Sequence, residues 1–353
     1  MNKTAIKNFA IWARNKLIDD ITGKTRLLGI TEKGINSPLP SSTKDIQFFD
    51  IGTKEPYSIS GNEIKQRDQL VKELEKRAQQ DEFKTAYNNL IEEVAYTWFN
   101  RLIAIRFMEV NDYLPSRIRV LSSETKSKSE PDIVTNPLAA DFGYTEDEKQ
   151  KILQMKNENK LDELFGFLFT KQCNALHNNL PELFEKINDY TELLLQVSFT
   201  DKDGVVYHLV NDINEDDFNV EKEGQVEIIG WLYQFYNTEP KDETFKLLKK
   251  NVKITKERIP SATQLFTPDW IVRYMVENSL GRLWVEGHPN EELKKNWKYY
   301  LEEAEQEEEV QKQLEEIRKE YSKLRPEDIK IMEIIMQRLI QFNDCRRSLQ
   351  LVG

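Results

Sequence analysis

The chain has 353 residues, of which 31% are charged, and its formal net charge is −11. No run approaches the roughly 18 apolar residues that a membrane span needs, and no secretory signal is visible in the first residues, so we expect neither a membrane nor a secreted protein. Cys173 and Cys345 are far apart, which argues against a disulfide scaffold and a zinc site. We expect a cytoplasmic protein of two or three domains.

The charge is unevenly distributed along the chain. Glutamates crowd residues 302–309, whereas basic side chains outnumber acidic ones near the start: Lys3, Lys7, Arg14, Lys16, Lys24 and Arg26. Because phosphate contacts need clustered Lys and Arg, this first segment is the expected contact region if DNA is bound. A solvated helix face explains the same charges equally well, so both interpretations stay open.

Residues 4–29 predict an amphipathic helix, since Ile6, Phe9, Leu17 and Ile21 recur at helical spacing with basic residues on the other side. Residues 23–25, Gly-Lys-Thr, resemble the end of a phosphate-binding loop. That loop requires a first glycine where this chain has Ile18, so it is rejected.

Residues 61–113 predict helices, and their second half predicts the core helix of the first domain. Two sets of large side chains line up at helical spacing, which indicates burial around most of the circumference: Trp98, Leu102, Ile105 and Met108, and Phe99, Ile103 and Phe107. Arg101 and Arg106 interrupt this stretch. A charge in a buried helix needs a partner, so paired structural arginines are favoured over contacts with DNA.

Residues 131–149 contain the letters of a metal-dependent nuclease site, in which carboxylates bind magnesium and a lysine assists: Pro131-Asp132, then Asp147-Glu148-Lys149. Such nucleases carry the second cluster on a strand. Here Thr145 and Glu148 form a capping box that opens a helix, so a nuclease is a distant alternative.

Two further stretches precede position 250. Residues 204–210, Gly-Val-Val-Tyr-His-Leu-Val, have the β-branched and aromatic density of a strand. Residues 227–237 place Ile228, Leu232 and Phe235 on one helix face with Trp231, which favours a core helix over a base-stacking platform. The basic run that follows could contact phosphates, although exposed lysines are usually only solvated: Lys246, Lys249, Lys250, Lys253, Lys256 and Arg258.

Residues 261–284 hold the candidate site. Thr267 is a good N-cap and Pro268 suits the first helical position, so a helix is predicted to begin there. Its start is suited to a carboxylate or phosphate, because free N–H groups and the positive end of the helix dipole lie there, although a Thr-Pro helix start is also common as plain structure. Its apolar residues predict one broad face that packs against something larger: Ile271, Val272, Met275, Val276, Leu280 and Leu283.

After a Gly-His-Pro turn at 287–289, about thirty residues predict a charged helix in two halves, ended by Pro326. Its thin apolar stripe is typical of a helical hairpin or arm rather than a core helix: Leu301, Ala304, Val310, Leu314, Ile317 and Tyr321.

Three long strings are distinctive: Tyr96-Thr-Trp-Phe-Asn-Arg-Leu102 with Arg106-Phe-Met-Glu109, Ile228-Ile-Gly-Trp-Leu-Tyr-Gln-Phe-Tyr236, and Gln264-Leu-Phe-Thr-Pro-Asp-Trp-Ile-Val-Arg-Tyr-Met-Val-Glu-Asn278. Together they resemble the PglX family, the adenine-specific DNA methyltransferases of BREX phage-defence systems, from Met1 to about Lys330. The resemblance implies methyl transfer from S-adenosylmethionine to the N6 amino group of a flipped-out adenine, which marks host DNA. It also implies that Phe266, Thr267 and Pro268 help to hold the cofactor.

Beyond residue 330 the sequence departs from the family. The expected Rossmann-like strand, its Asp-Pro-x-x-Gly-Ser-Gly turn and the Asn-Pro-Pro-aromatic loop are missing, and Asn136-Pro-Leu-Ala139 is not that loop. The resemblance therefore implies an N-terminal portion, truncated before the catalytic motifs and inactive alone, with no catalytic residue and no metal site of its own.

The expected fold is mainly α. Residues 1–255 are predicted to form a multi-helix N-terminal domain, and residues 256–353 the incomplete beginning of a Rossmann-like methyltransferase domain with a charged helical arm. The expected partners are DNA and, through the resemblance, other BREX components or a phage protein, with no membrane. A non-catalytic DNA- or protein-binding module derived from the family is the alternative.

Overall fold

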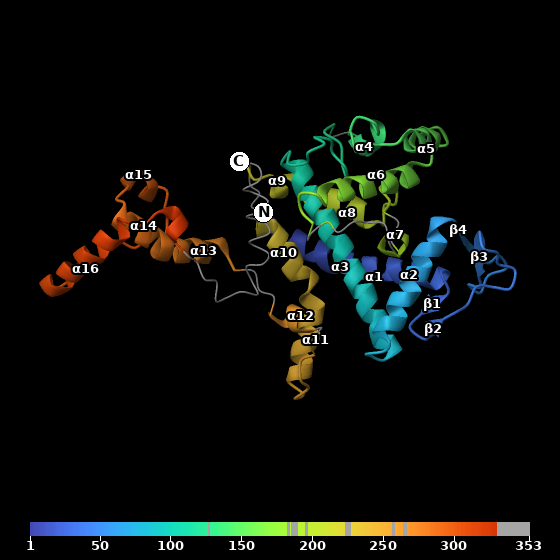
Figure 1. The fold of residues 1–353 in the computed structure, drawn as a ribbon, viewed down its shortest axis with the longest axis horizontal. Coiled ribbons are helices and arrows are strands. Elements are labelled where there is room, and N and C mark those ends of the chain that lie inside the picture. Colours follow the sequence, from blue (N-terminus) through green and yellow to red (C-terminus); the bar gives the residue numbers. More distant parts are fainter. Residues whose placement is uncertain are drawn as a thin grey trace. The chain divides into compact units, whose positions relative to one another are not determined.

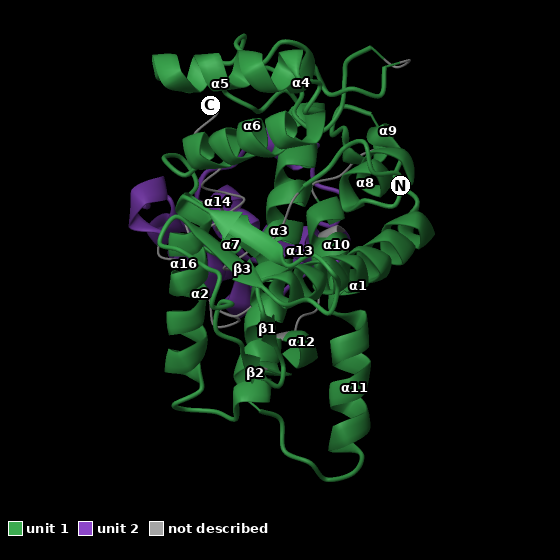
Figure 2. Ribbon diagram, turned by 90° about the vertical axis from the view of Figure 1, so that its right-hand side faces the viewer, with its two compact units in different colours: residues 1–263 green, residues 264–353 purple. Residues whose placement is uncertain are grey.

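The computed structural model describes residues 1–125, 128–181, 184, 190–194, 197–222, 227–255, 258–263 and 267–329. Its contacts divide the chain into two compact units, Met1–Thr263 and Gln264–Gly353, coloured separately in Figure 2. The described residues are mainly helical, as predicted. In this part of the chain, no helix combines the length and the apolar character that crossing a bilayer requires.

Unit 1 consists of helices and two short strand pairs. The strands pair antiparallel, β1 (Ile30–Thr31) with β2 (Gly34–Ile35) and β3 (Ile46–Phe49) with β4 (Tyr57–Ser60). The helices, labelled in Figure 1, are α1 (Lys3–Leu27), α2 (Asn62–Arg77), α3 (Phe83–Val110), α4 (Asp132–Thr135), α5 (Glu146–Asn157), α6 (Leu161–Leu176), α7 (Tyr190–Leu194), α8 (Val205–Asn211), α9 (Glu215–Phe218), α10 (Glu227–Tyr236), α11 (Thr238–Leu248) and α12 (Ile259–Thr263).

The helix predicted for residues 4–29 is present as α1. The Asn2 side chain accepts a hydrogen bond from the Ala5 N–H at 3.2 Å and caps its start. Beyond its other end, Gly29 has a φ of +73°, a left-handed conformation that stops the helix and that glycine adopts without steric cost. The apolar side of α1 is buried, and α1 packs against α3 and α10.

The core of unit 1 is built around α3, as its apolar density predicts. Trp98, Phe99 and Leu102 are at most 1% exposed, and the Trp98 indole N–H donates to the Thr191 carbonyl at 3.1 Å. Figure 1 shows α3 running through the middle of this unit, and α1, α2 and α10 all contact it. Since each buried large apolar side chain contributes about 1.5–3 kcal/mol, α3 is expected to dominate the stability of unit 1.

The strand predicted at residues 204–210 is wrong, because this segment forms α8. Val205, Val206 and Leu209 are buried at helical spacing, and the His208 ring centroid lies 4.2 Å from that of Trp12 on α1. A β-branched composition is a weak preference for strand, and packing against α1 overrides it here.

Unit 2 is helical over its described residues. Its elements are α13 (Asp269–Val276), the π-helical turn η2 (Glu277–Gly281), α14 (Arg282–Gly287), α15 (Glu291–Lys294), α16 (Glu308–Tyr321) and the 3₁₀ turn η3 (Pro326–Asp328). The helical path runs without a break from α13 through η2 into α14, and α16 packs against α14. Residues 267–329 include no strand, so the Rossmann-like start stays a prediction, as does the assignment of domains.

The charged arm is shorter than predicted, because residues 297–307 are not helical. The Tyr299 N–H donates to the Glu277 carboxylate at 2.6 Å, and the Leu301 N–H donates to the Asn278 side-chain oxygen at 2.8 Å. These contacts engage backbone groups that a continuous helix would pair internally. Leu301 and Ala304 therefore do not continue the apolar stripe of α16, and α16 ends at Tyr321, before Pro326.

Candidate functional site

Two of the three predicted cofactor-side residues can be placed. Thr267 and Pro268 are half-buried and immediately precede α13, whereas Phe266 lies outside the described residues. The predicted helix start is therefore present, but it is shifted by one residue. Pro268, not Thr267, is the N-cap.

The backbone of Pro268 explains this shift. Its φ of −55° and ψ of 141° are extended rather than helical, and its carbonyl accepts the N–H groups of Ile271 at 3.0 Å and Val272 at 3.3 Å. As the N-cap, Pro268 makes no side-chain hydrogen bond to the helix. The first N–H groups of a helix have no acceptor within it, so the start of α13 is suited to an anionic group.

The broad apolar face predicted for this helix is only partly covered. Ile271 and Val272 are half-buried, whereas Met275 is 50% exposed and Val276 is 48% exposed. What this face packs against therefore stays a prediction, whereas the helical spacing itself is confirmed by α13, η2 and α14.

The sequence patterns gave no sign of the π-helical turn η2. Here Glu277 is 5% exposed and binds the Tyr299 N–H, while the Asn278 side-chain amide donates to the carbonyls of Tyr274 and Tyr299, both at 2.8 Å. The Ser279 hydroxyl donates to the Met275 carbonyl at 2.6 Å. A π-turn inserts one residue into a helix and re-aims its side chains, and such turns are frequent at functional sites.

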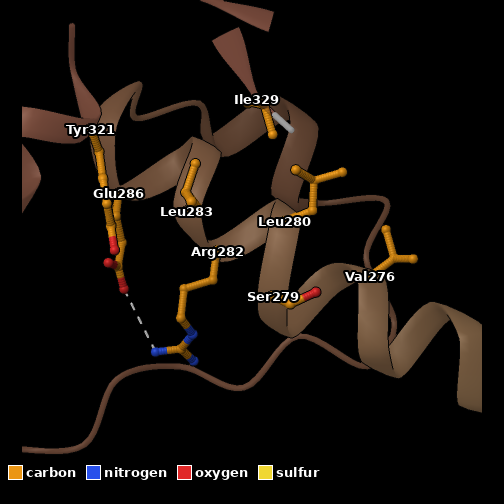
Figure 3. A pocket seen from close by; sticks show the side chains of 8 residues that line it. All are labelled: Val276, Ser279, Leu280, Arg282, Leu283, Glu286, Tyr321 and Ile329. Atoms are coloured by element: carbon orange, nitrogen blue, oxygen red, sulfur yellow. Dashed lines mark ion pairs between the residues drawn. The ribbon is translucent and has the colours of Figure 1, made fainter. Parts of the chain in front are cut away.

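A surface hollow of about 460 Å³ lies beside this turn (Figure 3). In Figure 3, Leu280 and Leu283 come from the η2–α14 side, and Arg282 points toward Glu286, with which it forms an ion pair of 3.7 Å. The lining residues are Val276, Ser279, Leu280, Arg282, Leu283, Glu286, Tyr321 and Ile329.

The chemistry of the hollow is that of an apolar surface with one ion pair. Its lining residues include no cysteine or histidine, and its one carboxylate, Glu286, is already paired with Arg282. Thr267 and Pro268 do not line it. The structure therefore brings Leu280 and Leu283 together with Tyr321, but it does not place the predicted cofactor-side residues in the same hollow.

A buried ionic cluster in unit 1 involves one of the two predicted structural arginines. Arg106 donates to Glu109 at 2.7 Å, to the Ser122 hydroxyl at 2.9 Å and to Glu215 at 3.2 Å. Arg119 also donates to Glu215, at 2.7 Å. The prediction of a paired structural arginine is thus confirmed for Arg106, which is 1% exposed.

The charges of this cluster compensate one another. Burial raises the pKa of Glu215, but the Arg119 and Arg106 guanidinium groups outweigh that effect and hold the pKa below its ordinary value. Glu109 accepts the N–H groups of Val120 and Leu121 in addition to Arg106. These contacts tie the segment after α3 to that helix, and they engage the carboxylates of Glu109 and Glu215 in structural pairing.

The nuclease alternative finds no support. The Asp132 carboxylate accepts hydrogen bonds from Ser123 and the Glu124 N–H, while Lys149 pairs with Glu146 at 2.7 Å. Glu148 closes the predicted capping box with Thr145 at the start of α5. Among the residues that the structure describes, no group of histidine, cysteine and carboxylate side chains could hold a metal ion.

Cys173 is not a candidate nucleophile. It is fully buried in α6, and this burial raises the pKa of its thiol to about 12. The thiol is therefore protonated at neutral pH, and the thiolate is the reactive form.

Comparison with known proteins gives one consistent result. No family model matches the chain. The chain is 51% identical over 323 residues to adenine-specific methyltransferase PglX of Lacticaseibacillus casei (strain Zhang), a match that covers 87% of this chain and 26% of that protein. It is 39% identical over 336 residues to adenine-specific methyltransferase BrxX of Escherichia coli O9:H4 (strain HS), covering 94% of this chain and 26% of that protein.

Both matches extend over nearly all of the chain, and they include the region of the three distinctive strings. The chain spans about a quarter of the length of these curated relatives. The resemblance to the PglX family is therefore confirmed, and the chain is similar to about a quarter of these adenine-specific methyltransferases.

Proposed function

We propose that this chain is part of a BREX-type DNA methyltransferase that transfers the methyl group of S-adenosylmethionine to adenine N6 in duplex DNA, in the cytoplasm, and so marks host DNA. The observation that carries the proposal is the 51% identity with PglX over 87% of the chain. An enzyme that modifies a base inside a duplex must extrude it, so the complete protein is expected to flip its target adenine.

Within that enzyme, residues 1–255 serve as a helical scaffold and residues from 256 onward begin the Rossmann-like methyltransferase domain. Phe266, Thr267 and Pro268 contribute one wall of the cofactor site. The start of α13 supports this role, because its N-cap Pro268 has no side-chain acceptor for the first N–H groups. The carboxylate of S-adenosylmethionine suits such a helix start.

The chain alone is not expected to transfer methyl groups. The glycine turn that lets the backbone approach the cofactor and the Asn-Pro-Pro-aromatic loop are not found in its 353 residues. A methyl-transfer assay with radiolabelled S-adenosylmethionine and unmodified DNA tests this directly, and turnover by the chain alone would contradict it.

A chimera tests the function itself. The matched quarter of Lacticaseibacillus casei PglX is replaced by this chain, and the chimera is produced in cells without adenine methylation. We expect N6-methyladenine in the digested DNA with the chimera, and none with PglX lacking that quarter or with this chain alone. A chimera that folds, as judged by circular dichroism, and still leaves the DNA unmethylated would refute the proposal.

A further inference from the structure

The basic run near the end of unit 1 forms a compact group of positive charge. Residues 244–255, Thr-Phe-Lys-Leu-Leu-Lys-Lys-Asn-Val-Lys-Ile-Thr, contain four lysines and no acidic residue, in a chain whose net charge is −11. We call these four the lysine ridge: Lys246, Lys249, Lys250 and Lys253. All four are exposed, whereas Lys256 lies outside the described residues.

The backbone places these lysines close together. Lys246 lies in the last turn of α11, Lys249 is its C-cap and Lys250 follows it, and their spacing of three and four residues places them near one another. Asn251 then has a φ of +60°, and the Val252 N–H donates to the Leu247 carbonyl at 3.1 Å. This turn brings Lys253 directly after the helix. Figure 1 shows α11 extending away from α10, with its C-terminal end at the tip.

The lysine ridge differs from the basic first segment in what its charges contact. In α1, Arg14 pairs with Glu92, Lys16 pairs with Asp20 at 2.6 Å, and Lys24 donates to the Tyr57 hydroxyl at 2.7 Å. In the part of the chain that the structure describes, no carboxylate forms an ion pair with any lysine of the ridge. The first segment is thus partly occupied by internal contacts, and the ridge is not.

Exposed apolar side chains lie between these lysines. Phe245 is 44% exposed, Val252 is 46% exposed and Ile254 is 37% exposed. Lysines at a helix C-terminus stabilise the helix dipole, which accounts for part of the pattern. That effect explains neither Lys253, which is five residues beyond the end of α11, nor the three exposed apolar side chains within ten residues. Unpaired cations beside apolar contacts are typical of a surface that meets a polyanion.

We infer that the lysine ridge binds the phosphate backbone of duplex DNA, independently of base sequence, and so helps to hold DNA against unit 1. This inference rests on the proposed function for its choice of polyanion. Each phosphate that a lysine neutralises releases counterions. Each such contact therefore contributes about −0.9 to the slope of the logarithm of the DNA-binding constant against the logarithm of the salt concentration. Four lysines thus account for a slope of about −3 to −4.

The test is fluorescence anisotropy of a labelled DNA duplex with the full chain, measured from low to moderate salt. The ridge variant carries Lys246→Gln, Lys249→Gln, Lys250→Gln and Lys253→Gln. The matched control carries the same change of charge at four other exposed lysines of unit 1: Lys33, Lys44, Lys54 and Lys65. Circular dichroism checks that both variants fold.

We expect the ridge variant to lose most of the salt dependence and to bind at least about tenfold more weakly at low salt, while the control follows the parent chain. Equal weakening in both variants, or no change in the ridge variant, or no measurable binding by the parent, would each overturn the inference. If DNA binding by the ridge variant is unchanged, an acidic protein becomes the alternative partner for the lysine ridge. The chimera assay tests the proposed function separately. If the chimera methylates DNA and the ridge variant binds DNA normally, the inference about the lysine ridge is overturned and the proposed function stands.

Discussion

Glu109 is the most enclosed carboxylate of the ionic cluster, with a side chain that is 0% exposed. It accepts hydrogen bonds from Arg106, Ser122 and two backbone N–H groups. Glu109→Gln removes the charge and leaves the Arg106 guanidinium with less compensation in a buried site. We expect a loss of about 3–5 kcal/mol in the free energy of unfolding, measured by urea denaturation.

Glu215→Gln is the matched control for this prediction. The Glu215 side chain is 38% exposed, so its pairing with Arg106 and Arg119 is screened by solvent and its loss is expected to cost about 1 kcal/mol or less. Its pKa is held below the ordinary value of 4.5, so its contribution is complete above pH 4.5 and is lost as the pH falls through the depressed pKa. The difference between parent and Glu215→Gln should therefore shrink in acid. Equal losses for the two variants at neutral pH would contradict this account.

At the level of single residues, the sequence predicts that a buried charge needs a partner but not which partner it finds. Arg106 and Glu109 are three residues apart on α3, so their pairing can be predicted from helical spacing alone. Glu215 is 109 residues further along the chain, and no local pattern connects it to Arg106. The cofactor-side residues show a similar limit, since the helix start was predicted but its cap was placed one residue too early, at Thr267.

Among the elements, the contact between α14 and α16 depends on a glycine. A Cβ atom added to Gly287 would lie 2.4 Å from the backbone carbonyl carbon of Tyr321. Backbone cannot yield as a flexible side chain does, so Gly287→Ala is expected to push α16 away from α14 at a cost of about 1–3 kcal/mol. Hydrogen exchange should then become faster in the amides of both helices.

The control is Gly166→Ala in α6. A Cβ atom at Gly166 meets nothing within 4 Å, so the same substitution should stabilise that helix by about 0.5–1 kcal/mol and slow its amide exchange. If Gly287→Ala also slowed exchange in α14 and α16, the close approach of these two helices would be refuted.

Elements with strong local signals were predicted well. The periodicity of α1 and α3 and the capping box of α5 were all recognised, because each depends on residues within one or two turns. The failures have tertiary causes. α8 is helical because α1 packs against it, and residues 297–307 leave the helical path because Glu277 and Asn278 hold their backbone.

At the scale of the whole molecule, the buried apolar residues are distributed very unequally. The core cluster runs from Ile6 to Tyr236 and lies entirely in unit 1. Among the described residues of unit 2, Val285 is the one buried apolar side chain. The predicted domains, residues 1–255 and 256–353, stay a prediction, and the contacts divide the chain into compact units at 263/264. The distribution of buried apolar residues shows that unit 1 carries most of the stability. Amino-acid composition alone does not indicate this.

This difference predicts how the two units behave when separated. Residues 1–263 contain a continuous core and should fold alone, with helical circular dichroism and one cooperative urea transition. Residues 264–353 should be helical in part, since α16 carries helix-supporting ion pairs such as Lys312–Glu308. They should melt without cooperativity, because the described part of this unit, residues 267–329, buries so little apolar surface. Amide exchange on each fragment provides a second measure. Protected amides and a sharp transition in the 264–353 fragment would show that its helices are held together by a core that the described residues do not contain.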